Sequence, residues 1–248
     1  FNCSGSLTIG GRRIGCWKAG GHGHQTFSDA IKNSCNPAFV AIGSSLGAHN
    51  FFKYFEAYGL TKQTGISLPG EAEGIYHSEK NLTQHALAVS SFGQTFKITP
   101  IQIITAISAA LNGGKLMEPT LVKQVLDADQ NIIKNYEPKV VRQVISEEVS
   151  KLIAPMLERV VTEGSGRNAY VQGYRIGGKT GTSQKIDEKD EHGNDTKRIS
   201  SFLGFAPVND PEIAILVILD EPDTASTFGS ISSAPLAGAV LADVLPYI

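Results

Sequence analysis

The stretch "GYRIGGKTGTSQ", residues 173–184, decides between two fold classes. Its first eight residues fit the phosphate-binding template G-x-x-x-x-G-K-[ST], and the run "IAILVILDEP" (213–222) ends in an acidic pair like the second half of an ATPase signature. A phosphate loop, however, lies between a buried strand and the N-terminus of a helix. Here "TEGSGRNAYVQ" precedes the stretch and a long polar run follows it, so neither flank fits. We therefore favour a strand that carries Lys179-Thr180-Gly181 over a nucleotide-binding loop.

Length and composition limit the class of protein. The chain has 248 residues, 41% of them hydrophobic, which is enough for one large domain or two small ones. Its net charge of −2 and its interspersed acids and bases predict no nucleic-acid partner. The longest apolar run, residues 213–219, is far shorter than the roughly 20 residues that a membrane helix needs. If the protein acts at a membrane, its anchor is expected outside this chain.

Hydrophobic periodicity and capping residues predict helices first and strands later. A hairpin is expected to turn at Gly10–Gly11, and short strands or hairpins to occupy residues 115–145. The predicted helices are 26–33, one that starts at Asn36-Pro37, 49–58, 82–89, 99–113, 146–164 and 236–245, and the predicted strands are 174–183, 199–207 and 212–220. The residues expected to face inward are Ile101, Ile104, Ile107 and Leu111 in helix 99–113, and Val149, Leu152, Ile153, Met156, Val160 and Val161 in helix 146–164. This order indicates an α+β fold, mostly helical over 1–114, with a helix, an antiparallel sheet and a C-terminal helix over 115–248.

Two short serine motifs lie in the helical part. The first, "GSSLG" at 43–47, fits the nucleophile elbow G-x-S-x-G, which needs a strand that enters a sharp turn. Because residues 43–47 lie inside the helix that Pro37 begins, we interpret their small side chains as sites of close helix packing. The second, Ser34-Cys35-Asn36, lies in the tight joint between two helices and is by itself weak evidence of function.

A Ser-x-Asn in a helix joint and a Lys-Thr-Gly on a later strand form the layout of two of the three motifs of active-site-serine penicillin-binding proteins and β-lactamases. Further stretches in the same order are "CWKAGGHGHQTFSDAIKNSCNPAFV", "TGISLPGEAEG", "SSFGQTFKITPIQ", "SAALNGG", "VVTEGSGRNA" and "GYRIGGKTGTSQK". On these residues the chain resembles the C-terminal part of a class B penicillin-binding protein transpeptidase domain, and within that class the sporulation type of endospore-forming bacteria. The resemblance implies the penicillin-binding protein transpeptidase and β-lactamase-like fold, with a helical subdomain and an antiparallel sheet, truncated at the N-terminus.

The same resemblance implies an acyl transfer that cross-links peptidoglycan stem peptides, with β-lactam antibiotics as further ligands. Ser34 would hydrogen-bond the catalytic lysine and relay a proton to the leaving amine. Asn36 would hold the amide of the donor peptide. Lys179 would supply positive potential near the nucleophile and the substrate carboxylate.

The strand residues that follow Lys179 would bind the substrate. The hydroxyl groups of Thr180 and Thr182 would bind its carboxylate, and the Thr182 N–H would form half of the oxyanion hole. Gly181 leaves room for the substrate backbone. Gln94, in "SFGQ", resembles a residue of the cleft wall, and a loop hydrogen bond is an equally good interpretation of it.

The sequence departs from the family in one motif, because none of its lysines has a serine three residues before it. The Ser-x-x-Lys that would supply nucleophile and base is expected upstream, so we expect a truncated and inactive chain rather than a pseudoenzyme. Part of the helical core is then expected to be uncovered and to cause self-association. A penicillin- or peptidoglycan-binding sensor without turnover is the main alternative, and a β-lactamase is the second. The full-length protein is expected at the extracytoplasmic face of a bacterial cell membrane.

The cysteines raise the question of a metal site. Cys3, Cys16 and Cys35 all lie near the N-terminus, with His22 and His24 among them. A Cys/His zinc site is conceivable, but the spacing fits no standard zinc finger. We therefore expect a hairpin with two buried thiols, and neither a metal nor a cofactor.

A disulfide is the other hypothesis for these cysteines. In an oxidising compartment Cys35 could pair with Cys16 or with Cys3. A pair of Cys3 with Cys16 is disfavoured, because a turn at Gly10–Gly11 places them out of register. We hypothesise that Cys16 and Cys35 form a redox pair whose disulfide would distort the Ser-x-Asn motif.

Overall fold

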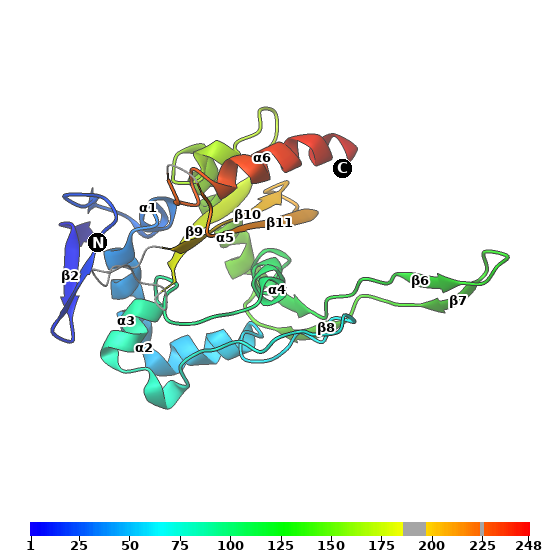
Figure 1. The fold of residues 1–248 in the computed structure, drawn as a ribbon, viewed down its shortest axis with the longest axis horizontal. Coiled ribbons are helices and arrows are strands. Elements are labelled where there is room, and N and C mark those ends of the chain that lie inside the picture. Colours follow the sequence, from blue (N-terminus) through cyan, green and yellow to red (C-terminus); the bar gives the residue numbers. More distant parts are fainter. Residues whose placement is uncertain (186–196, 224–225) are drawn as a thin grey trace.

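The computed structural model describes residues 1–185, 197–223 and 226–248, and their centre is a three-stranded antiparallel sheet (Figure 1). Its strands are β9 (Gly177–Gln184), β10 (Arg198–Ala206) and β11 (Ile213–Asp220), in the order β11-β10-β9. In this register Phe202 lies opposite Thr180 on one side and Val217 on the other. The α+β class is therefore confirmed. The nucleotide-binding alternative fails, because Lys179 lies within an antiparallel strand and does not begin a helix.

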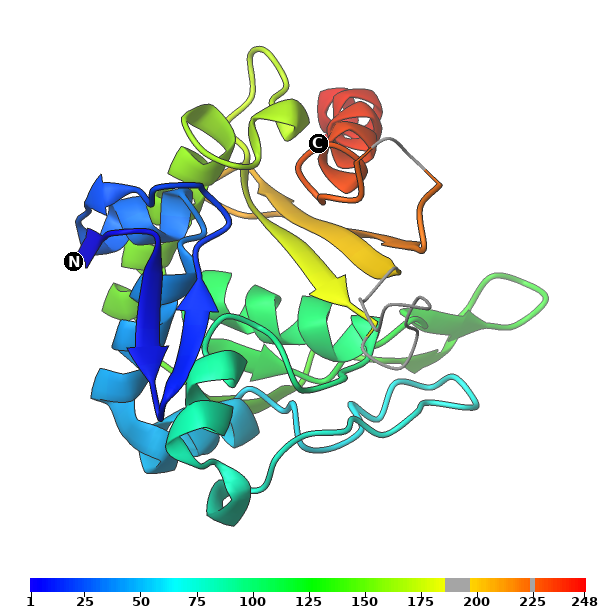
Figure 2. The same ribbon diagram turned by 60° about the vertical axis from the view of Figure 1, so that its left-hand side comes forward.

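Helices cover both faces of the sheet (Figure 2). Alternate β10 residues point to opposite faces, so Phe202 and Ala206 pack with α6 (Ser233–Val244), while Phe205 packs with α5 (Glu147–Thr162) and α4 (Pro100–Leu111). Phe202 and Phe205 are fully buried. The hydrophobic core thus lies in two layers, one on each side of β10.

The buried face of α5 differs from the predicted one. Val149 and Leu152 were expected to face inward, but their exposed fractions are 44% and 60%. The buried row is instead Ser150, Ala154, Leu157, Val160 and Val161. The small residues of this row face α4 and β10: Ser150 Oγ donates to the Ala110 carbonyl, and Ala154 packs in one cluster with Leu111 and Phe205. Hydrophobic periodicity alone does not single out such small residues. In α4, similarly, Leu111 is buried together with Gln102, Ala109 and Ala110, while Ile101, Ile104 and Ile107 are only half-buried.

The N-terminal part consists of two small sheets beside three helices. Its elements are β1 (Asn2–Cys3) paired with β4 (Gly23–His24), β2 (Ser6–Ile9) paired with β3 (Arg12–Gly15), α1 (Phe27–Lys32), α2 (Asn36–Ala57) and α3 (Gln84–Ser90). The two predicted helices that start at 36 and 49 are one element with a break at Gly47, where φ is 79°. Gly43 lies inside α2, and a Cβ there would be 1.8 Å from Ser91 Oγ of the loop after α3. Close packing is therefore confirmed for Gly43, whereas Ser44 and Ser45 of the same stretch are exposed.

Hairpins occupy residues 115–145, as predicted. β5 (Lys115–Met117) pairs with β8 (Val140–Gln143), and β6 (Gln124–Leu126) pairs with β7 (Ile132–Asn135) in a hairpin that projects from the body of the molecule (Figure 1). Three short 3-10 helices complete the chain, at Glu79–Asn81, Arg167–Ala169 and Leu245–Tyr247. Most of the long polar loop predicted after β9 lies outside the described residues. Within the part of the chain that is described, every helix is too short or too polar to cross a membrane.

Candidate active site

The Ser-x-Asn motif forms the joint between α1 and α2. Helix α1 ends with Asn33 as its C-cap, and α2 begins at Asn36 with Pro37 in its first turn, where the missing N–H of proline costs nothing. Between the helices Ser34 takes a φ of 50°, an uncommon value for a residue other than glycine. Such a conformation costs about 1–3 kcal/mol and persists only where the surroundings enforce it. The joint therefore places Ser34 in one defined orientation.

An ionic network holds this joint against α5. The Arg159 guanidinium donates to Asp29 of α1 at 3.0 Å and to Glu163 at 3.1 Å, and Lys32 reaches Glu163 at 3.4 Å. The Ser165 N–H also donates to the Lys32 carbonyl. Because α5 packs against β9, the network fixes the position of the joint relative to that strand.

Lys179 joins the two motifs. Its Nζ donates to Ser34 Oγ at 2.7 Å and to the Thr180 carbonyl at 2.8 Å, across a sequence separation of 145 residues in the first case. No carboxylate pairs with Lys179 among the ion pairs of the described residues, and burial lowers the pKa of Lys179 to about 8. At neutral pH the side chain is thus a cation that loses its proton readily.

The two threonines lie on the opposite face of β9 from Lys179, because successive residues of a strand alternate. The Thr180 hydroxyl lies 3.0 Å from the Ser165 hydroxyl. The Thr182 hydroxyl accepts a hydrogen bond from the Gly229 N–H at 3.1 Å and keeps its own proton to donate. The sequence did not predict this separation of the cation from the hydroxyl groups.

The free edge of β9 carries backbone donors. In an antiparallel strand the N–H and C=O groups of one residue point to the same side. The Thr180 carbonyl accepts from Lys179 and the Thr182 carbonyl accepts from Gln94 Nε2 at 3.3 Å, so both point away from β10. The Thr182 N–H must point the same way. A carbonyl group that enters the cleft would meet this N–H.

Gln94 and Asn36 tie neighbouring loops to the site. Gln94, in the loop after α3, reaches across to the Thr182 carbonyl of β9, so its amide lies at the free edge of the strand. The Asn36 amide donates a long hydrogen bond of 3.4 Å to the Gly15 carbonyl of β3. Both side chains are half-buried, which leaves part of each amide accessible.

Three contributors to the site were not predicted. Trp17 donates its indole N–H to the Asn33 carbonyl at 2.9 Å and to the Ser34 carbonyl at 3.2 Å, which braces the joint. Ser165 and Gly229 contact Thr180 and Thr182 as described above. The available signal for Trp17 and Ser165 was that they stand in "CWKAGGHGHQTFSDAIKNSCNPAFV" and "VVTEGSGRNA", two of the stretches that carry the resemblance. Gly229 gave none.

The three cysteines are free thiols. Cys3 and Cys35 are buried and Cys16 is half-buried, so two buried thiols are present as expected. Burial raises the pKa of Cys16 to about 12, which leaves little of the thiolate that attacks disulfides. The Cys16–Cys35 redox pair stays a prediction.

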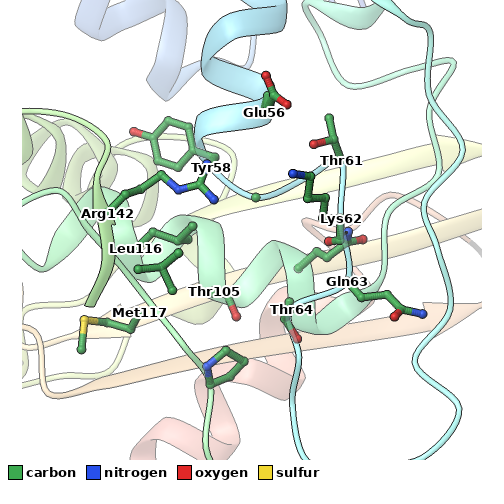
Figure 3. Close-up of a pocket in the computed structure, with 14 residues that line it drawn as sticks. Glu56, Tyr58, Thr61, Lys62, Gln63, Thr64, Thr105, Leu116, Met117 and Arg142 are labelled. Carbon is green, nitrogen blue, oxygen red and sulfur yellow. Dashed lines mark hydrogen bonds between the residues drawn. The ribbon is translucent and has the colours of Figure 1, made fainter. Parts of the chain in front are cut away.

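A separate cavity of about 110 Å³ opens at the C-terminal end of α2 (Figure 3). Residues of α4, β5 and β8 complete its wall, among them Thr105, Leu116 and Arg142. None of the Ser-x-Asn or Lys-Thr-Gly residues contributes to it. The cavity is therefore distinct from the candidate site.

Comparison with known families identifies the family to which the chain belongs. Residues 1–242 match the penicillin binding protein transpeptidase domain. The chain belongs to this transpeptidase family. Among relatives in the family, stage V sporulation protein D of Bacillus subtilis (strain 168) is 44% identical over 99% of this chain and 38% of its own length. A peptidoglycan D,D-transpeptidase FtsI homolog of Mesostigma viride is 31% identical over 90% of this chain and 40% of its own length.

Solved structures of the transpeptidase family share the fold. The apo transpeptidase domain of Burkholderia pseudomallei penicillin-binding protein 3 superposes with a TM-score of 0.85 at 28% identity, covering 99% of this chain and 70% of that one. Penicillin-binding protein 3 of Mycobacterium tuberculosis in complex with aztreonam gives 0.87 at 25% identity, covering 100% and 57%. These matches confirm the resemblance and the fold class inferred from the sequence. The chain spans 38% and 40% of the length of the two curated relatives above.

Proposed function

We propose that this chain forms two walls of a serine D,D-transpeptidase site that cross-links peptidoglycan stem peptides and is acylated by β-lactams. The observation that carries the proposal is the 2.7 Å hydrogen bond from Lys179 to Ser34, which joins the Lys-Thr-Gly strand to the Ser-x-Asn joint. The membership in the transpeptidase family and the likeness to a β-lactam complex support it.

The reaction would proceed by two acyl transfers. A serine hydroxyl oxygen attacks the carbonyl carbon between the two terminal D-alanines and gives its proton to a base. The C–N bond breaks, and the terminal D-alanine leaves as an amine that has taken up one proton. The amino group of a neighbouring stem peptide then attacks the resulting ester, loses one proton, and the serine oxygen recovers it.

Ser34 would deliver the proton to the leaving amine. Its oxygen accepts a hydrogen bond from the Lys179 ammonium group, so its own O–H points elsewhere. The positive φ of Ser34 sets the direction in which the backbone holds this side chain. Because the pKa of Lys179 is lowered to about 8, the lysine can restore the proton that Ser34 gives away.

The free edge of β9 would bind the substrate. The Thr182 N–H would donate to the oxyanion of the tetrahedral intermediate, an interaction typically worth about 3–4 kcal/mol of barrier. The Thr182 hydroxyl retains a proton for the substrate carboxylate, and Lys179 contributes positive potential from the other face of the strand. The Thr180 hydroxyl, which contacts the Ser165 hydroxyl, would bind the same carboxylate. Asn36 and Gln94 would hold the peptide on either side.

The nucleophile would be supplied by a Ser-x-x-Lys outside these 248 residues, since none of the lysines here follows a serine at that spacing. The protein that carries this chain would act on the outer face of the bacterial membrane, where peptidoglycan is cross-linked. Its membrane anchor would then lie in the remainder of the protein. Self-association of the isolated chain also stays a prediction, tested by sedimentation.

A fluorescent penicillin tests the proposed function. The full-length protein is expected to carry the label covalently after denaturing electrophoresis, because its serine forms a stable ester with the opened β-lactam. The 248-residue chain alone is expected to carry none. A full-length protein without label would contradict a transpeptidase and favour the sensor alternative. Covalent label on the isolated chain would contradict an external nucleophile.

A further inference from the structure

Three cysteines and one histidine converge at the base of the Ser-x-Asn joint. The ligand atoms of Cys3, Cys16, His22 and Cys35 all lie within 4.8 Å of one another. Each comes from a different place: Cys3 ends β1, Cys16 follows β3, His22 precedes β4, and Cys35 is the N-cap of α2. In Figure 2 the N-terminal strands lie beside α1 and the start of α2, where these segments meet.

The spacing of the atoms suits a tetrahedral ion. Zinc–sulfur bonds of about 2.3 Å and zinc–nitrogen bonds of about 2.0 Å place neighbouring ligand atoms about 3.6–3.8 Å apart. Cys16 Sγ and His22 Nδ1 are 3.3 Å apart, and the longest separation in the cluster exceeds the ideal by only about 1 Å. Small side-chain rotations would bring all four atoms onto one centre.

Backbone N–H groups surround two of the sulfur atoms. Those of Gly5 and His22 point at the Cys3 sulfur, and that of Lys18 points at the Cys16 sulfur. Gly5 and Lys18 each follow their cysteine by two residues, so the chain turns around both sulfur atoms in the same way. Outer contacts of this kind orient the ligands of a metal site.

His22 is poorly explained without an ion. Its Nε2 is buried and has no hydrogen-bond partner among the described residues, and its Nδ1 faces only the Cys16 sulfur. A buried imidazole normally finds an oxygen partner for at least one nitrogen. A disulfide between any two of the cysteines would leave the third thiol and this imidazole unused, whereas a four-ligand ion uses all of them.

We propose that Cys3, Cys16, His22 and Cys35 bind one zinc ion in a structural site. Three sulfur ligands and one nitrogen ligand in a closed tetrahedral arrangement are the set that zinc prefers. Binding displaces the thiol protons to solvent, so the three thiolates and the neutral imidazole leave the occupied site with a net charge of −1. The spacing of these residues fits no finger motif and therefore predicted no metal. The four ligands come from separate segments that only the fold brings together.

The ion would fix the catalytic joint. Cys35 stands between Ser34 and Asn36, so a bond from its sulfur to zinc anchors the motif to β1, β3 and the loop before β4. This cross-link would help to enforce the positive φ of Ser34. The metal site itself does not depend on the proposed transpeptidase function, whereas its effect on acylation does.

Metal analysis of the full-length protein, purified with its thiols reduced, tests the proposal directly. About one zinc ion per chain is expected after extensive dialysis. The chelated protein is expected to take up one cobalt(II) ion with the intense visible bands of tetrahedral thiolate coordination. A protein that retains no zinc and gives no such cobalt spectrum would overturn the proposal, as would a purified protein without metal in which mass spectrometry finds Cys16 bonded to Cys35.

Matched variants locate the ligands. Cys16→Ser and His22→Gln are each expected to lose the zinc, while His24→Gln is expected to keep it, because His24 is exposed on β4 and lies outside the cluster. Full zinc retention by Cys16→Ser would overturn the ligand assignment. Removing zinc from the native protein is expected to slow β-lactam acylation by about 10- to 100-fold, since a shift of about 1 Å near a reacting group costs that much. Re-addition of zinc should restore the rate, and an unchanged rate in the chelated protein would exclude the effect on the joint.

Discussion

Replacing Lys179 with methionine is expected to slow β-lactam acylation of the full-length protein by about 10²–10⁴-fold, the range of a positioned proton-transfer group. The variant removes the 2.7 Å hydrogen bond to Ser34 and, with it, the side-chain cation that donates to this hydroxyl. The second-order rate constant of acylation, measured with a chromogenic β-lactam, checks the result. Lys123→Met, an exposed change outside the site, is the control and should leave the rate unchanged.

The pH profile distinguishes a proton-transfer role of Lys179 from a structural one. Because its pKa is lowered to about 8, the native rate is expected to fall as pH rises through about 8, and this fall should be absent from the residual rate of Lys179→Met. The unfolded chain keeps the proton up to its ordinary value of 10.5, so the folded state binds fewer protons between about 8 and 10.5 and becomes more stable as pH rises there. Lys179→Met should therefore fold well at pH 7. A variant that acylates at the native rate, or one that unfolds at pH 7, would contradict this account.

Truncating Phe202 to alanine is expected to lower the free energy of unfolding by about 3–5 kcal/mol. The ring is fully buried between β10 and α6, and glycines 166, 178 and 204 approach it closely. Glycines have no side chains that could move into the space left behind, so most of the cavity should remain. The expected fall of the thermal midpoint is roughly 6–20 °C, measured by circular dichroism or calorimetry.

Phe228→Ala is the matched control for Phe202, because it removes the same ring from a side chain that is 50% exposed. A change within about 0.5 kcal/mol is expected there, as for most surface substitutions. Equal losses in the two variants would contradict the description of Phe202 as the centre of the core between β10 and α6.

The sequence predicted the local structure best where a residue type has one dominant effect. Pro37 and Pro100 start helices, Ser146 caps another, and Gly10–Gly11 closes a hairpin, as the structure confirms. It was wrong about the buried face of α5, because Val149 and Leu152 look as apolar as any core residue. Which stripe of a helix is buried depends on the elements that pack against it: Ser150 bonds to the end of α4, and Ala154 packs in the cluster of Leu111 and Phe205.

The residues of the candidate site likewise form two groups, those that sequence motifs predict and those that they do not. Ser34, Asn36 and Lys179 could be proposed from motifs, and the structure brings Lys179 within hydrogen-bond distance of Ser34. The contacts of Ser165 and Gly229 could not be predicted, and a zinc site on the cysteines and His22 was no more than conceivable, because each depends on chain segments that meet only after folding. Contacts between distant segments leave no trace in spacing or periodicity.

The unpaired edge of β9 has a consequence for how the protein meets other chains. An unpaired strand edge is a template for aggregation and domain swapping as well as for a peptide substrate. Here the Lys179 charge and the Gln94 amide both occupy edge carbonyls, so a long strand from another molecule would have to displace both contacts. A short, flexible peptide can instead reach the Thr182 N–H alone. The side chains proposed to act in catalysis at this edge would therefore also protect the sheet from growing.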